Sequence, residues 1–320
     1  MFGKMSSLAG VRLVLRAGLA GIMLILAAGF AIAQSLAENP AKACSLEHLK
    51  DSAKVGQFLF RSYKSDDDSG CLVVLHAGKI IFRRTVDSFD GYTLGQRADK
   101  EQGVPAIANG TDITGRGRPD MIVSLYTGGA HCCTIHYVFE LEPDFKLLAT
   151  LDAEDSWPAY FADLDGDHHY YYLADDWTFA YWPNCFACSP WAPIKLRFVE
   201  DGKAGSYHLA LDKMRQPEPT PTEWGKSLQE TRKTFSEPNW ELSIGTTLWD
   251  TELKLIYAGH ADLAWKFLDE AWPAKVKGKS EWLGNFCSRL KTSPYWPDLE
   301  PVVRDAPSAC ANAKPGPGER

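Results

Sequence analysis

The sequence lacks an excess of basic residues. Lysine and arginine number 34, against 41 aspartates and glutamates, and the formal net charge is −7. No stripe of clustered lysine and arginine is present to bind a phosphate backbone, so nucleic acid is not an expected partner. The motifs Gly-x-Ser-x-Gly and His-Glu-x-x-His and a phosphate-binding glycine loop are also missing. No catalytic constellation is therefore evident.

Long apolar runs are missing after residue 33, and a bilayer span takes about 20 such residues. Before it, Lys4, Arg12 and Arg16 precede an apolar run that ends in Ala31-Ile32-Ala33, which fits a small-x-small cleavage site. The sequence predicts a signal peptide over residues 1–33, with an uncleaved anchor as the alternative. Its removal changes the formal charge from −7 to −10 because three cations leave. We expect a periplasmic or secreted protein with no stable membrane insertion.

The cysteines all follow the predicted leader, and their even number predicts disulfides in an oxidising compartment. Eight cysteines allow 105 pairings, so the connectivity cannot be derived from spacing. We expect one bridge to hold the C-terminal tail, between Cys287 and Cys310, and another to staple a loop, between Cys185 and Cys188. The candidates are Cys44, Cys71, Cys132, Cys133, Cys185, Cys188, Cys287 and Cys310.

Two cysteine clusters admit a functional alternative. Neighbouring residues of a strand face opposite ways, so Cys132-Cys133 predicts two separate bridges or a vicinal one. The alternative is a soft-metal or redox site that adds His131 and His136. The Cys185-Phe186-Ala187-Cys188 motif is typical of thiol oxidoreductases, but Pro190 follows and no amphipathic helix does. Structural disulfides are favoured in both places.

The chain divides by pattern into two parts. Alternating apolar residues and short turns predict three antiparallel hairpin units within a β domain over residues 34–215. Proline-rich residues 216–223 predict a linker. Three-to-four apolar spacing predicts helices over residues 224–310, and a disordered tail is expected over 311–320.

Two acidic turns lie 51 positions apart in the β part. They are Asp112-Ile113-Thr114-Gly115-Arg116-Gly117 and Asp163-Leu164-Asp165-Gly166-Asp167-His168, and each precedes a strand-like run. The stretch from Asp112 to Val123 resembles an FG-GAP (integrin-α-like) or VCBS repeat. This resemblance implies blade-like β units of a partial propeller, with Ca²⁺ held in the acidic turn.

Both turns depart from that repeat pattern. The first has Thr114 and Arg116 where oxygen ligands are expected, and a guanidinium there would repel or replace a cation. The second keeps Asp163, Asp165 and Asp167, and Ca²⁺ needs 6–8 oxygen ligands at about 2.3–2.6 Å. The sequence therefore offers these three aspartates as a Ca²⁺ site. The alternative is a tight turn whose aspartates accept backbone hydrogen bonds.

Aromatic residues crowd between positions 157 and 191, and such rings serve equally in a core or in a binding surface for sugars and proteins. We expect most of them in the core, with Trp177 and Trp182 as the exposed binding candidates. Glu154 and Asp155 beside Trp157 form a carbohydrate-compatible mixture, with exposed loop acids as the simpler interpretation.

The segment from Tyr257 to Ala271 resembles the centre of a tetratricopeptide unit and predicts a helical hairpin around Gly259. The expected fold class is α+β, with an antiparallel, partly propeller-like β-repeat domain followed by a small helical domain. The expected function is an exported binding or scaffold protein with a protein or carbohydrate partner. The alternatives are a hydrolase acting on envelope polymers and a thiol-redox protein.

Overall fold

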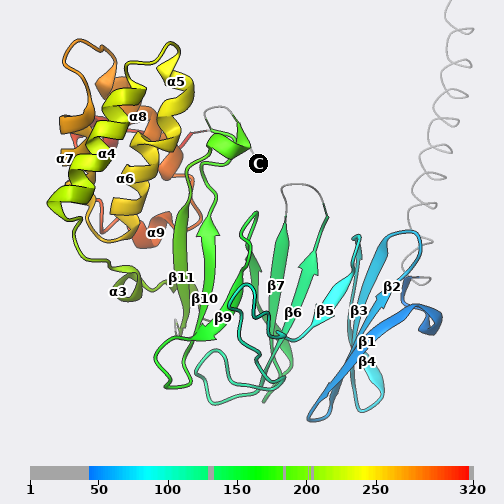
Figure 1. Cartoon of the computed structure of the whole chain (residues 1–320). Coiled ribbons are helices and arrows are strands. Elements are labelled where there is room, and N and C mark those ends of the chain that lie inside the picture. The colour runs from blue at the N-terminus through cyan, green and yellow to red at the C-terminus, as the bar shows by residue number, and fades with distance from the viewer. Residues whose placement is uncertain (1–42, 129–132, 183–184, 201, 203–204, 317–320) are drawn as a thin grey trace, which may run out of the picture.

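The computed structural model describes residues 43–128, 133–182, 185–200, 202 and 205–316. The predicted signal peptide over 1–33 and Cys132 lie outside this part of the chain. The described residues form three four-stranded antiparallel sheets and a group of helices, which confirms the predicted α+β class. In Figure 1 the sheets stand in a row, and the helices lie at the end of that row beside β10 and β11.

Each sheet is a meander in which consecutive strands pair antiparallel. Two-residue turns or short loops join most of these strands, so local turn chemistry fixes much of the pairing. The first sheet follows the 3₁₀ turn η1 (Leu46–His48) and holds β1 (Leu49–Val55), β2 (Phe58–Lys64), β3 (Ser69–His76) and β4 (Lys79–Asp87). The second holds β5 (Tyr92–Leu94), β6 (Asp120–Tyr126), β7 (Thr134–Glu140) and β8 (Lys146–Asp152). The third holds β9 (Tyr160–Asp163), β10 (Tyr170–Asp176), β11 (Ala192–Val199) and β12 (Ser206–Leu209), with the 3₁₀ turn η2 (Phe186–Cys188) before β11.

The first and second sheets share an apolar core. Phe60 of β2 and Phe82 of β4 both meet Phe139 of β7 edge-on, with ring centroids 5.7 Å and 5.2 Å apart. Phe145 stacks on Phe139 at 5.6 Å. Because successive strand residues alternate between faces, the inward rings of each strand reach the neighbouring sheet and join the two units.

The two acidic turns occupy equivalent places and have matching geometry. Each leads into the second strand of its sheet, β6 or β10. The Asp112 carboxylate accepts the backbone N–H groups of the residues four and five positions later, and so does the carboxylate of Asp163. Gly115 and Gly166 both have left-handed backbone, with φ of +73° and +71°. His168 also adopts φ +65°, at the position where the first turn has a glycine. The two segments are therefore similar in structure as well as in sequence.

The helical part begins with a well-formed cap. The Thr220 side chain accepts the backbone N–H of Glu223, while the Glu223 carboxylate accepts the backbone N–H of Thr220. Pro221 then occupies the first turn, where its missing N–H costs nothing. The last three residues of the predicted linker thus belong to a helix. The helices are α3 (Leu211–Met214), α4 (Pro221–Thr234), α5 (Trp240–Ser243), η3 (Ile244–Thr246), α6 (Leu248–Tyr257), α7 (Ala261–Ala271), α8 (Lys279–Leu290), α9 (Trp296–Leu299) and α10 (Ser308–Ala311).

The predicted helical hairpin is present as α6 and α7. Gly259 joins them at φ +82°, a conformation that favours glycine. Further along, the beginning of the predicted disordered tail is held against α8. The Lys291 ammonium donates to the carbonyls of Ala311 and Ala313, and the Gly316 N–H donates to Ser288.

The helices and the third sheet share one continuous core. Trp249 of α6 lies between Trp182 and Trp282, stacked at 4.0 Å and 4.5 Å between ring centroids. At the end of β10, buried Asp176 accepts hydrogen bonds from the Tyr257 hydroxyl and from the Ser293 hydroxyl at 2.6 Å. The helices are therefore held against the sheet by these contacts in addition to the linker.

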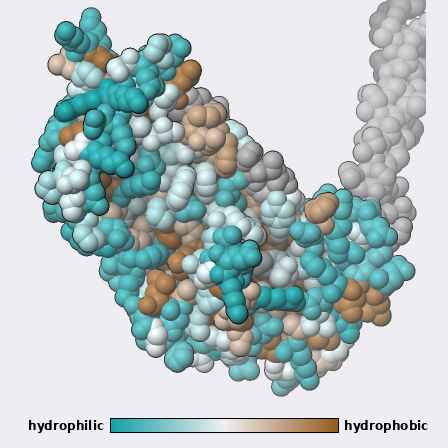
Figure 2. Space-filling model, viewed as in Figure 1, coloured by the Kyte–Doolittle hydropathy of each residue, from teal (hydrophilic) through white to brown (hydrophobic). Residues whose placement is uncertain are grey.

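Among the described helices, none combines the length and apolar character that crossing a membrane would take. Figure 2 shows a mostly hydrophilic face over the helices, with hydrophobic residues in separate patches lower down.

Candidate functional site

The three aspartates of the predicted Ca²⁺ turn have other partners in this structure. The Asp163 carboxylate accepts the N–H groups of Gly166 at 2.7 Å and His168 at 2.9 Å. Asp165 lies 2.8 Å from the Lys213 ammonium and accepts the Tyr171 hydroxyl at 3.2 Å. These hydrogen bonds lower the pKa of both carboxyls. Asp167 contacts the His169 ring at 3.3 Å.

No group of three or more metal-ligating side chains occurs within the described ranges. The Asp163 turn has the hydrogen bonds of a tight turn, while the Ca²⁺ site stays a sequence-based prediction. In the first turn, Arg116 pairs with the Glu140 carboxylate of β7 at 2.8 Å and with the Glu200 carboxylate directly after β11 at 2.7 Å. The Arg116 guanidinium therefore provides a positive charge at the first turn, where the repeat pattern would place a cation.

Three disulfides have both of their cysteines in the described segments, and Cys133 is disulfide-bonded as well. The three join Cys44 to Cys71, Cys185 to Cys188, and Cys287 to Cys310. Both predicted pairs are confirmed, and none of the cysteines in the described segments is a free thiol. These bonds indicate a non-cytoplasmic, oxidising compartment.

Trp177 and Trp182, the predicted exposed rings, are both half-buried. Trp182 packs into the helical core against Trp249. Trp177 stacks between Phe186 at 5.1 Å and Trp191 at 6.0 Å. The most exposed tryptophan in this region is Trp157, whose side chain is 73% exposed, and Trp191 is 38% exposed.

Trp157 and Trp191 line one groove of about 610 Å³ between the third sheet and α6. Trp157 and Tyr160 lie on the segment that enters β9, while Trp191 lies directly before β11. Lys254 and Tyr257 close the groove from α6. Segments far apart in the sequence thus meet there because the helices pack on the third sheet beside β11 (Figure 1). The full lining is Gln102, Trp157, Pro158, Tyr160, Leu173, Ala174, Asp175, Trp191, Pro193, Ile194, Lys195, Met214, Gln216, Lys254, Tyr257 and Ala258.

The polar groups of the groove are few and distinct. Asp175 is half-buried, and burial raises the pKa of its carboxyl to about 6. Lys254 is paired with Asp250 at 2.8 Å and lies 5.8 Å from the centre of the Trp191 ring. Lys195 donates to the Lys213 carbonyl at 2.9 Å. Both ammonium groups therefore already have hydrogen-bond acceptors. Asp175 is the one acidic side chain in the lining.

A hydrogen bond of its backbone helps to position Asp175. The Asp175 N–H donates to the Ser156 hydroxyl at 2.8 Å, which ties the Trp157 segment to β10. The bond between Trp157 and Pro158 is cis. Asp175 and Asp176 are neighbours on β10, so their side chains lie on opposite faces. One faces the groove, and the other enters the core beneath the helices.

Sequence reasoning reached this groove only in part. The mixture of Glu154, Asp155 and Trp157 is a carbohydrate-compatible signal, and Trp157 does line the groove. Trp191 and Asp175 carried no separate signal, because each is one aromatic or acidic residue among many nearby.

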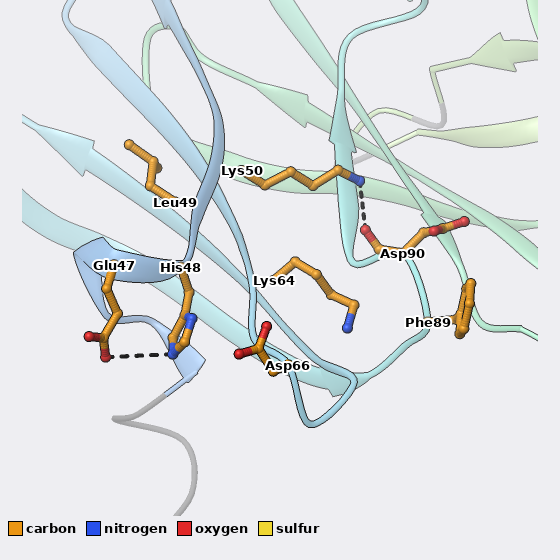
Figure 3. Close-up of a pocket in the computed structure, with 8 residues that line it drawn as sticks. All are labelled: Glu47, His48, Leu49, Lys50, Lys64, Asp66, Phe89 and Asp90. Atoms are coloured by element: carbon orange, nitrogen blue, oxygen red, sulfur yellow. Dashed lines mark hydrogen bonds and ion pairs between the residues drawn. The ribbon is translucent and has the colours of Figure 1, made fainter.

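A second hollow lies at the start of the first sheet and is mainly polar. Figure 3 shows Lys50 pointing to Asp90, where its ammonium donates to the backbone carbonyl at 2.6 Å. Glu47 and His48 also face one another, with 3.6 Å between carboxylate and ring nitrogen. Phe89 is the one exposed ring in its lining. The groove beside β11, with two exposed tryptophans, is the stronger candidate for ligand binding.

Neither a protein-family model nor a curated protein nor a solved structure matches this chain.

Proposed function

We propose that this is an exported binding protein, periplasmic or secreted, whose ligand occupies the groove lined by Trp157, Trp191 and Asp175. The observation that carries the proposal is the exposure of Trp157 in the same groove as the partly buried carboxylate of Asp175. Large exposed rings cost solvation free energy and are enriched where proteins bind ligands. A groove of this volume lies within the usual range of about 300–1,000 Å³ for small-molecule sites.

In this proposal the three sheets act as a rigid scaffold. They are repeats of one four-stranded unit, placed side by side as an open, propeller-like array. The matching turns at Asp112 and Asp163 support this duplication. Ca²⁺ at the second turn would add rigidity to the loop that leads into β10.

The alternative is a hydrolase acting on an envelope polymer. Glycoside hydrolysis by the usual mechanism takes two carboxyl groups, about 5–10 Å apart. The groove lining supplies Asp175 alone, which favours binding without turnover. Incubation of the protein with the bound polymer, followed by product sizing, distinguishes the two: shortened chains would establish the hydrolase.

The thiol-redox alternative makes a different demand. It needs Cys185 and Cys188 to cycle between disulfide and dithiol, and the pair is a disulfide within a short loop beside Phe186. An insulin-reduction assay with the purified protein tests it, and catalysed precipitation of insulin chains would favour redox activity over binding.

Binding at the groove can be tested with fluorine-labelled tryptophan. The chain has 11 tryptophans, and ¹⁹F NMR resolves such a number when each signal is assigned with a Trp→Phe variant. The probes are a linear hexasaccharide, a proline-rich peptide and choline. We expect at least one to shift the Trp157 and Trp191 signals and leave that of Trp265, in the helical core, unchanged. If no probe moves either groove signal, the groove is not a binding site and the proposal fails.

A further inference from the structure

The groove between the third sheet and α6 has aromatic and polar groups that suit one class of ligand, and we infer that this ligand is a carbohydrate chain. This inference rests on the proposed function, because it names the ligand of the same groove. The ligand would lie with sugar rings against Trp157 and Trp191 and with hydroxyl groups toward Asp175 and Gln102.

The exposed rings provide the first argument. A pyranose has a flat C–H face and a rim of hydroxyl groups, so it buries apolar area on a ring while its rim stays hydrogen-bonded. Trp157 is 73% exposed and Trp191 38% exposed, and they come from different segments of the same groove. Covering such surface with the flat face of a sugar removes apolar area from water and so favours binding. Two separated rings suit successive units of a chain better than a single small molecule.

The polar lining provides the second argument. Gln102 can donate and accept hydrogen bonds, and Asp175, when ionised, only accepts. Sugar hydroxyls do both, so they satisfy this mixed set. A proline-rich peptide would also pack on aromatic rings, but its prolines carry no N–H to donate. Where those prolines cover the Asp175 carboxylate, it would lose water without gaining a hydrogen bond, which weakens binding.

The charges provide the third argument. The Lys254 ammonium is paired with the Asp250 carboxylate, and ionised Asp175 in the lining would repel an anion, so the groove is poorly suited to a polyanion. The Lys254 ammonium lies 5.8 Å from the Trp191 ring centre and would repel a cationic ligand at that ring. An aromatic cage for a quaternary ammonium group therefore fits less well than an uncharged polyol does.

The test is isothermal titration with cellohexaose, maltohexaose and chitohexaose, combined with the ¹⁹F spectra. We expect at least one hexasaccharide to bind and to shift the Trp157 and Trp191 signals. Trp157→Ala should weaken its binding at least tenfold, since its ring contributes stacking beyond area burial. The matched control is Phe89→Ala, which removes a similarly exposed ring near the first sheet, and it should leave the affinity unchanged.

A second variant addresses the polar contact. Asp175→Asn keeps the shape of the side chain and should weaken hexasaccharide binding roughly three- to tenfold, with the melting temperature of each variant measured as a check on folding. Affinities unchanged in both Trp157→Ala and Asp175→Asn would overturn the inference, because the sugar would then bind elsewhere.

The outcomes separate the two proposals. If no hexasaccharide binds while the proline-rich peptide or choline shifts the groove signals, the ligand class is wrong and the binding function stands. If no probe shifts them, both proposals fall.

Discussion

Asp176 should be one of the main determinants of how firmly the helices are attached to the sheets. Its side chain is buried at the end of β10. It accepts hydrogen bonds from the Tyr257 hydroxyl of α6, from the Ser293 hydroxyl after α8, and from the Thr178 N–H at 2.8 Å. Substitution by alanine leaves two hydroxyl donors without an acceptor inside the core.

The expected cost follows from these contacts. Hydrogen bonds to a charged group each contribute about 1.5–3 kcal/mol, and orphaned buried donors add their desolvation. Because such terms are not additive within one network, we expect Asp176→Ala to lower the free energy of unfolding by about 3 to 5 kcal/mol. At about 2–4 °C per kcal/mol, the melting temperature should fall by roughly 10 °C.

The assay is urea unfolding followed by circular dichroism, with Asp175→Ala as the control. The control removes the adjacent carboxylate, which faces the groove, and should change stability by less than about 1 kcal/mol. Calorimetry of Asp176→Ala should also separate the melting of the helical part from that of the sheets. A double-mutant cycle with Tyr257→Phe should give a coupling energy of about 1 kcal/mol or more.

Two results would refute this reasoning. One is a loss below about 1 kcal/mol for Asp176→Ala, and the other is an equal loss for both carboxylates. Either would mean that the apolar contacts around Trp249, rather than this polar network, hold the helices in place.

Three further predictions follow from buried or turn residues. Burial lowers the pKa of His136 to about 4, so the unfolded chain binds a proton that the folded one does not, and stability should fall between about pH 6.5 and 4. His136→Gln should make the free energy of unfolding depend less on pH in that window. An unchanged pH dependence would contradict the assignment. Burial raises the pKa of Glu252, whose oxygens have no partner in the described part of the chain. The folded state therefore holds a proton that the unfolded state loses above about pH 4.5, and Glu252→Gln should stabilise the protein more at pH 8 than at pH 5 in urea melts. Finally, millimolar Ca²⁺ should raise the melting temperature relative to EDTA through the Asp163 turn, and identical melts would exclude that site.

Local sequence patterns anticipated much of the secondary structure. Hairpins were predictable because turn residues and strand alternation act over a few positions. The turns at Asp112 and Asp163 were recognisable because an aspartate that accepts nearby N–H groups requires only its own loop. The Cys185–Cys188 and Cys287–Cys310 bridges match the expectation that one staples a loop and the other holds the C-terminal tail, although spacing alone left 105 pairings open.

Tertiary structure decided what those local patterns could not. The exposure of a tryptophan depends on which segments cover it, so Trp182 entered the core while Trp157 stayed in solvent. Asp175 and Asp176 are chemically identical neighbours, yet the strand places one in the groove and the other beneath α6. The groove itself exists only because α6 packs beside β11, a contact between residues about 60 positions apart. Sequence alone determined the units of this protein, whereas the site arose from long-range packing, which a local pattern does not encode.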